Sequence, residues 1–199
     1  MSKLVIIINN KEDLNSFYSK LRYYLLFHNK EVMVINIDNI DEKNKEDLLM
    51  IEEAFNIKNK YKRLEYVYQT LCDILDKDIE KNVCEFDKNG LCIAQRKGKC
   101  PSKKNGCCGT CQFIGKKGCT ITSLSCKTFY CSYLKKTKNF TNYKDIKLYQ
   151  YFLSTPQKLI IEANFWNTKE DNLRLLYKAN IFTWLLHKNK KMKLNYDII

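Results

Sequence analysis

Nine cysteines within 48 residues constrain this chain more than any other feature of its sequence. They are Cys84, Cys92, Cys100, Cys107, Cys108, Cys111, Cys119, Cys126 and Cys131. The tenth cysteine, Cys72, lies outside this segment, on the edge of an apolar helical pattern, and is expected to be a core thiol. Clustered thiols either bind metal, form disulfides or remain as reactive thiols, so the segment has three interpretations.

Metal binding is the favoured interpretation of the segment. Cys108-Gly-Thr-Cys111 is a C-x-x-C pattern, and Gly109 suits the tight turn that brings two thiolates to one metal. The two histidines, His28 and His187, lie far from the segment, which favours coordination by sulfur alone. Two Cys₄ zinc sites would use eight thiols and one [4Fe–4S] cluster would use four. Zinc is the expected metal, with an iron–sulfur cluster as the alternative.

The spacing ranks the candidate ligands without pairing them into sites. The first candidates are Cys108, Cys111, Cys126 and Cys131, followed by Cys107 and Cys119, while Cys84, Cys92 and Cys100 could form much of a second site. Disulfides are less expected because the number of cysteines in the segment is odd and no export signal is recognised. The longest aliphatic run, 4–8, is far shorter than the ~20 residues of a membrane span. The sequence therefore predicts a cytoplasmic protein without a membrane span.

The positive charge lies in the same part of the chain. The formal net charge is +13, and residues 88–147 hold 14 basic residues and one acidic residue. No carboxylate occurs in the 57 residues from Lys88 to Lys144. Bases mixed with aromatic residues are typical of nucleic-acid-binding surfaces. They are Arg96, Lys97, Lys99, Lys103, Lys104, Lys116, Lys117, Lys127, Phe129, Tyr130, Tyr133, Lys135, Lys136, Lys138 and Phe140. The alternative is that the lysines offset the negative charge of metal-bound thiolates.

Periodicity predicts an α+β fold on both sides of the segment. Residues 4–8 and 31–37 are expected to be buried strands, and residues 11–28 the helix between them, which together make a parallel βαβ unit. Further helices are expected over 43–55, 60–81, 143–153, 155–166 and 168–188, whereas 84–131 shows no sustained periodicity and is expected to be irregular. Asp41 and Thr168 are expected to cap the helices that follow them.

Three parts of the chain follow from these patterns. Residues 1–82 are expected to form an α/β N-terminal arm and residues 83–132 a metal-stapled, cysteine-rich module. Residues 133–199 are expected to form a helical C-terminal arm that packs on the first arm. The acidic residues after the second strand, Asp38, Asp41 and Glu42, are interpreted as a solvated loop with a helix cap.

Part of the cysteine segment resembles a known family. Cys107-Cys108-Gly-Thr-Cys111-Gln-Phe-Ile, Gly118-Cys119-Thr-Ile and Ser125-Cys126-Lys-Thr-Phe resemble the cysteine-cluster (CxxCxxCC-type) zinc- or iron-chelating proteins, to which flagellin lysine methylases are similar. The resemblance covers about 40 of the 199 residues. It implies metal chelation by these cysteines, with methyl transfer as an enzymatic alternative.

A weaker resemblance lies at the N-terminus. Lys3-Leu-Val-Ile-Ile-Ile-Asn-Asn and Glu31-Val-Met-Val-Ile-Asn-Ile-Asp38 resemble the opening βαβ unit of flavodoxin-like NAD(P)H:FMN oxidoreductases. That likeness implies a phosphate-binding loop after the first strand. The loop here, 9–13, has no glycine and carries two carboxylates, so a scaffold without a cofactor is expected.

The sequence thus predicts a metal-binding protein in which thiolate-held zinc has a structural role. Its basic module is a candidate nucleic-acid-binding surface. The alternative is a redox or methyl-transfer enzyme that uses an iron–sulfur cluster or a flavin, and the oligomeric state is not predicted.

Overall fold

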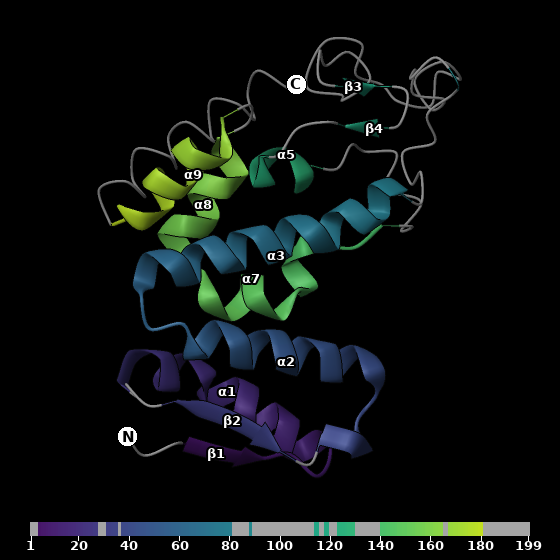
Figure 1. Cartoon of the computed structure of the whole chain (residues 1–199), viewed down its shortest axis with the longest axis vertical. Helices are drawn as coiled ribbons and strands as arrows, with labels where there is room; N and C mark the ends of the chain where they lie inside the picture. Colours follow the sequence, from purple (N-terminus) through teal and green to yellow (C-terminus); the bar gives the residue numbers. More distant parts are fainter. Residues whose placement is uncertain are drawn as a thin grey trace. The chain divides into compact units, whose positions relative to one another are not determined.

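The protein is a mixed α+β fold made mostly of helices (Figure 1). The computed structural model describes residues 4–27, 31–35, 37–80, 88, 114–115, 118–119, 123–129, 140–164 and 167–180. The chain divides into two compact units. The first comprises residues 1–67 and 144–154, and the second comprises residues 68–143 and 155–199.

The first unit contains the parallel βαβ unit that the sequence predicts. Strands β1 (Leu4–Ile7) and β2 (Val32–Ile35) pair in parallel, and α1 (Lys11–Phe27) connects them. The second strand is shorter than expected, because a 3₁₀ turn, η1 (Ile37–Asn39), follows it. Helix α2 (Glu42–Asn56) packs against β2 (Figure 1).

Short polar side chains set the starts of the helices. The Asn10 Oδ1 atom accepts hydrogen bonds from the Glu12 and Asp13 amides, each at 2.9 Å, at the start of α1. The Asn44 amide donates to Asp41 Oδ1 at 3.0 Å, which confirms the predicted cap of α2. The backbone amide and the side-chain amide of Asn44 both donate to Asp41, and they hold the pKa of Asp41 below its usual range. The carboxylate of Asp13 is likewise used locally, since it accepts the Asn9 amide.

The two strands place apolar residues on both faces of the sheet. Val32 and Val34 are buried, whereas Val5, Ile7 and Met33 are 46%, 53% and 36% exposed. The expectation that both strands are buried is therefore wrong for this face of the sheet, although parallel sheets are normally covered on both faces.

The side chain of Asn56 occupies the outer edge of β2. Its Oδ1 atom accepts the Val32 amide at 2.8 Å, and its Nδ2 donates to the Val32 carbonyl at 2.9 Å. The last residue of α2 therefore satisfies the same two backbone groups that a third strand would satisfy.

Helix α7 (Lys147–Phe152) brings part of the C-terminal sequence into the first unit. It packs against α1 and α2. The Tyr151 ring stacks on the Tyr18 ring with 5.6 Å between the ring centres. The Lys147 ammonium lies 4.8 Å from the centre of the Tyr18 ring. The Arg22 guanidinium donates to the Gln150 carbonyl at 3.1 Å. Aromatic and cation–π contacts thus join α7 to α1.

The described residues of the second unit form helices and one short hairpin. This unit holds the later part of α3 (Lys60–Glu80), β3 (Ile114–Gly115), β4 (Gly118–Cys119), α5 (Leu124–Lys127), α8 (Thr155–Ala163) and α9 (Lys169–Tyr177), and η3 (Tyr143–Asp145) lies at the unit boundary. Both α5 and α9 pack against α8. The buried apolar side chains include Leu71, Leu75, Leu124, Ile160, Ile161, Leu173 and Leu176.

Two expectations about this unit need correction. The segment 84–131, expected to be irregular, contains the β3–β4 hairpin and helix α5, which are too short to produce a detectable periodicity. The helix expected over 168–188 ends at Tyr177, where the Lys178 amide donates to the carbonyls of Arg174 and Leu176. Thr168 caps its start as predicted, because Thr168 Oγ1 accepts the Asp171 amide at 3.1 Å.

The division into parts at 82/83 and 132/133 stays a prediction, because most of 83–132 lies outside the described residues. Among the helices that the structure describes, none combines the length and the apolar character that crossing a bilayer requires.

Replacing Asn56 by alanine should lower the free energy of unfolding by about 1–2 kcal/mol, because two backbone groups of Val32 lose their partners. Urea denaturation followed by circular dichroism measures the change. Asn15→Ala is the matched control, since Asn15 is exposed on α1 and alanine favours helix there. An equal stability of Asn56→Ala and the unmodified protein would contradict the edge role.

Candidate metal centre

The structure places two of the nine predicted metal ligands. Cys119 lies in β4, and Cys126 lies in α5, where it is half-buried. The other predicted ligands, Cys84, Cys92, Cys100, Cys107, Cys108, Cys111 and Cys131, lie outside the described residues. Within the described ranges, no group of three or more histidine, cysteine or acidic side chains is arranged to hold a metal ion.

Strands β3 and β4 form an antiparallel hairpin that ends at Cys119. Ile114 pairs with Cys119 and Gly115 pairs with Gly118. Six residues lie between Cys119 and Cys126, so one candidate ligand ends the hairpin and the next lies on α5. The backbone of both positions is in regular structure.

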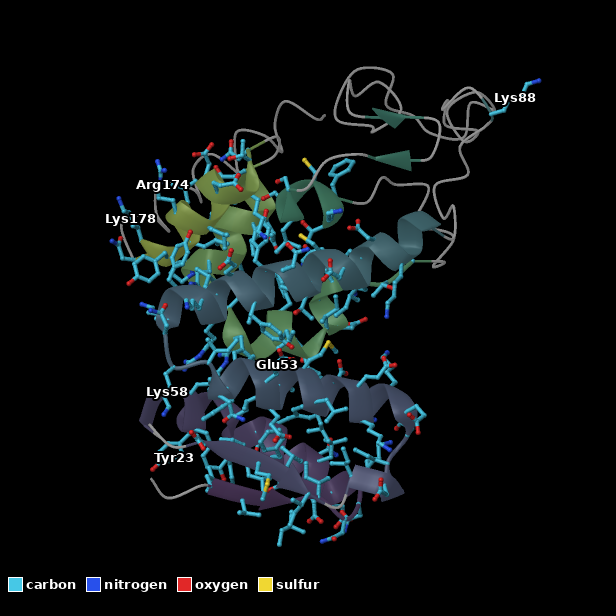
Figure 2. All side chains as sticks on the ribbon, viewed as in Figure 1. Tyr23, Glu53, Lys58, Lys88, Arg174 and Lys178 are labelled. Carbon is cyan, nitrogen blue, oxygen red and sulfur yellow. The ribbon has the colours of Figure 1, made fainter. Side chains whose placement is uncertain are left out.

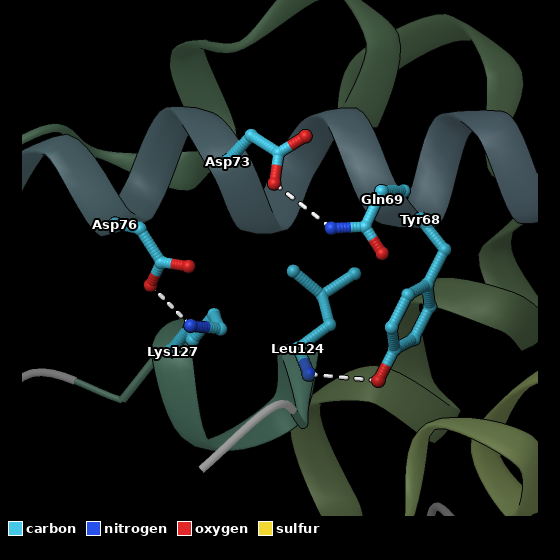
Figure 3. Close-up of polar contacts among 6 residues, drawn as sticks. All are labelled: Tyr68, Gln69, Asp73, Asp76, Leu124 and Lys127. Atoms are coloured by element: carbon cyan, nitrogen blue, oxygen red, sulfur yellow. Dashed lines mark hydrogen bonds and ion pairs between the residues drawn. The ribbon is translucent and has the colours of Figure 1, made fainter. Parts of the chain in front are cut away.

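Helix α5 is attached at its N-terminus through a buried polar junction. The Leu124 amide donates to the Tyr68 hydroxyl of α3 at 2.8 Å (Figure 3). Asn172 Nδ2 of α9 donates to Ser123 Oγ at 3.0 Å and to the Tyr68 hydroxyl at 3.3 Å. Burial raises the pKa of Tyr68, so its hydroxyl is neutral at physiological pH.

The same helix is attached at its C-terminus by an ion pair. The Lys127 ammonium contacts the Asp76 carboxylate of α3 (Figure 3). The Lys127 side chain is 6% exposed and that of Asp76 is 42% exposed. Breaking a pair that buries one charge costs more than breaking a surface pair, because the remaining charge is poorly solvated.

Helix α9 is joined to α3 by a further polar link. Lys169 Nζ donates to Gln69 Oε1 at 2.8 Å, and Gln69 Nε2 donates to Asp73 Oδ1 at 2.8 Å. Polar side chains from α3, α5 and α9 therefore meet in one region of the second unit. We call the six residues that hold α5 in place the α5 anchor; they are Tyr68, Asp76, Ser123, Leu124, Lys127 and Asn172.

No pattern in the sequence predicts the α5 anchor as a whole. The available signal was a polar residue, Asn172, inside an apolar helical face, which is typical of a buried hydrogen-bonding side chain. The sequence predicts Lys127 on the basic surface, which is wrong, because its ammonium is buried against Asp76. Of the other bases in 88–147, Lys88 is exposed (Figure 2), whereas those from Arg96 to Lys117 and from Lys135 to Lys138 lie outside the described residues.

The acidic residues after β2 have the structural roles expected of them. Asp41 caps α2 through Asn44, and Asp38 forms an exposed ion pair with Lys45 at 3.4 Å. An ion pair of this kind contributes little to stability.

Comparison with known proteins gives no match: no family model, no curated protein and no solved structure is significantly similar to this chain.

The buried thiol of Cys72 differs from the candidate ligands. It is 4% exposed on α3, and burial raises its pKa to about 12. At pH 8 a thiol with a pKa of about 12 is ionised in only about one molecule in 10⁴. Cys72 should therefore resist iodoacetamide at pH 8 in the folded protein and react once urea unfolds the chain. Peptide mass spectrometry measures the labelling, and rapid labelling of Cys72 without urea would contradict its placement.

A second buried titratable group, Asp47, lies in the first unit. Desolvation raises its pKa, although Lys43 and Lys147 act in the opposite direction. When the pKa of a carboxyl is raised by folding, the free energy of unfolding falls as the pH rises through that pKa. The charged form of Asp47 therefore destabilises the fold at neutral pH.

Asp47→Asn should therefore raise the free energy of unfolding at pH 7, and the gain should shrink as the pH falls through the raised pKa of Asp47 and vanish below the ordinary range of aspartate. Chemical denaturation between pH 3 and pH 8 tests this. Asp145→Asn is the control, because Asp145 is exposed. A gain that is constant across the pH range would show that desolvation of Asp47 is not the cause.

Proposed function

We propose that residues 84–131 form a thiolate metal-binding module with a structural role, and that zinc is its metal. An iron–sulfur cluster is the alternative cofactor. The first candidate ligands are Cys108, Cys111, Cys126 and Cys131. The helices of the second unit serve as the scaffold of this module.

The observation that carries the proposal is the attachment of α5, the helix of Cys126. A helix of four residues is unstable by itself. Here a buried hydrogen bond to Tyr68 and a partly buried ion pair with Asp76 attach its first and last residues to α3. The thiol between these two attachments is half-buried, which suits a ligand that must be rigid and still reachable by a metal ion.

The distribution of thiols supports the same conclusion. Cys72 is part of the helical core, and nine thiols remain for a segment of 48 residues. A segment of that size buries little apolar surface, so metal binding is an effective source of folding energy. The absence of carboxylates from Lys88 to Lys144 fits a module whose lysines balance thiolate charge.

A nucleic-acid-binding surface on the module remains a prediction from sequence. It would use the bases on either side of α5, because Lys127 is engaged with Asp76. The structural metal role does not depend on it.

The test is elemental analysis and visible spectroscopy of protein purified without oxygen. We expect one or two zinc ions per chain and no visible absorption, as for one or two Cys₄ sites. The double variant Cys111→Ser/Cys126→Ser should lose at least one zinc. Cys72→Ala is the matched control, since it also removes a thiol and should keep the full metal content.

Other results would redirect the assignment. Iron with inorganic sulfide and a brown colour would replace zinc by an iron–sulfur cluster and favour the enzymatic alternative. A metal-free protein whose cysteines resist alkylation until reduced would overturn the proposal in favour of disulfides.

A further inference from the structure

We infer that Tyr68 is a positioning residue for the proposed metal centre, and that metal binding and the folding of α3, α5 and α9 are coupled through its hydroxyl. This inference rests on the proposed function. It adds a residue that touches no metal and that the spacing of the cysteines does not indicate.

The first step is the way in which α5 begins. Ser123 is the N-cap of α5, but its side chain makes no capping hydrogen bond. Its hydroxyl instead accepts a hydrogen bond from Asn172. The first amide of the helix, that of Leu124, is satisfied by the Tyr68 hydroxyl, 56 residues away in the sequence. Tyr68 thus performs from another helix part of the task that a cap residue normally performs locally.

The second step is burial. Tyr68 is 1% exposed, and Ser123, Leu124 and Asn172 are also buried. Water cannot replace a lost partner at such a site, so removing the hydroxyl leaves the Leu124 amide unsatisfied. A shift of α5 that lets the Leu124 amide reach another acceptor would relieve this cost.

The third step connects this junction to the thiol. Cys126 lies two residues after Leu124 and directly before Lys127, whose ammonium is held by Asp76. A shift of the N-terminal end of α5 therefore displaces the Cys126 sulfur or strains the ion pair. Metal sites tolerate only small ligand displacements, and loss of a residue that orients a ligand typically weakens metal binding about 10–100-fold.

Coupling also operates in the reverse direction. A metal ion that binds the folded chain and not the unfolded chain stabilises every contact on which its ligands depend. The Leu124 amide and the Asn172 side chain should then exchange hydrogen with solvent more slowly in metal-loaded protein. Metal binding should therefore slow hydrogen exchange in α9, a helix without cysteines.

The experiment compares Tyr68→Phe with Tyr18→Phe in the full-length chain. Tyr18 is the matched control, because it is also a buried tyrosine but its hydroxyl finds no hydrogen-bond partner among the residues that the structure describes. Zinc affinity is measured by competition with a chromophoric chelator, and Co²⁺ replaces zinc for the thiolate charge-transfer spectrum. We expect Tyr68→Phe to weaken zinc binding about tenfold and to alter the Co²⁺ spectrum, and Tyr18→Phe to do neither.

A double-mutant cycle with Cys126→Ser separates positioning from general destabilisation. If Tyr68 acts through Cys126, Tyr68→Phe should cost no further zinc affinity in the Cys126→Ser background. An equal additional loss in that background would overturn the inference. Should Tyr68→Phe fail to fold, Ser123→Ala enters the same cycle, because it keeps the Tyr68 hydroxyl and removes the Ser123 hydroxyl, which is a hydrogen-bond partner of both Asn172 and Tyr68. This variant is expected to weaken binding about threefold.

The outcomes distinguish this inference from the proposed function. If the unmodified protein binds no metal, both fail. If it binds zinc and Tyr68→Phe binds with unchanged affinity and an unchanged Co²⁺ spectrum, the inference fails and the proposed function stands.

Discussion

The hydrogen bond from the Leu124 amide to the Tyr68 hydroxyl is the contact on which the attachment of α5 to α3 and α9 depends. It lies in a buried site, where an unmade hydrogen bond costs about 1–3 kcal/mol. The exposed ion pairs of the chain, such as Lys58 with Glu31 at 3.6 Å, are individually worth far less. Because Asn172 joins the same hydroxyl, one oxygen atom links three helices that lie far apart in the sequence.

The two cysteines whose side chains the structure describes, Cys72 and Cys126, lie in different environments. The Cys72 thiol is desolvated within α3, so it stays protonated and acts as a small apolar side chain. Cys126 is half-buried on a helix that is held at both ends, which suits a metal ligand. The difference arises from burial and attachment, because both residues have the same intrinsic chemistry.

Local signals in the sequence predicted local structure well. The caps at Asp41 and Thr168 were identified because a short polar side chain needs only its own helix to act. The helices over 43–55 and 60–81 were found to within one residue at each end, since their apolar spacing is sustained over several turns. Helix α5 and the β3–β4 hairpin were missed because each spans too few residues to repeat a pattern.

The sequence by itself determined the parallel βαβ unit, the main helices and the segregation of nine cysteines into a basic segment. These features depend on periodicity and spacing, which are properties of neighbouring residues. Only the tertiary structure decided that Lys127 is a buried ion-pair partner and that Asn56 occupies the edge of β2. It also decided that the Tyr68 hydroxyl accepts the first amide of α5. Each of these roles requires a partner at least 24 residues away, and no local pattern specifies which distant group will be brought within hydrogen-bonding distance.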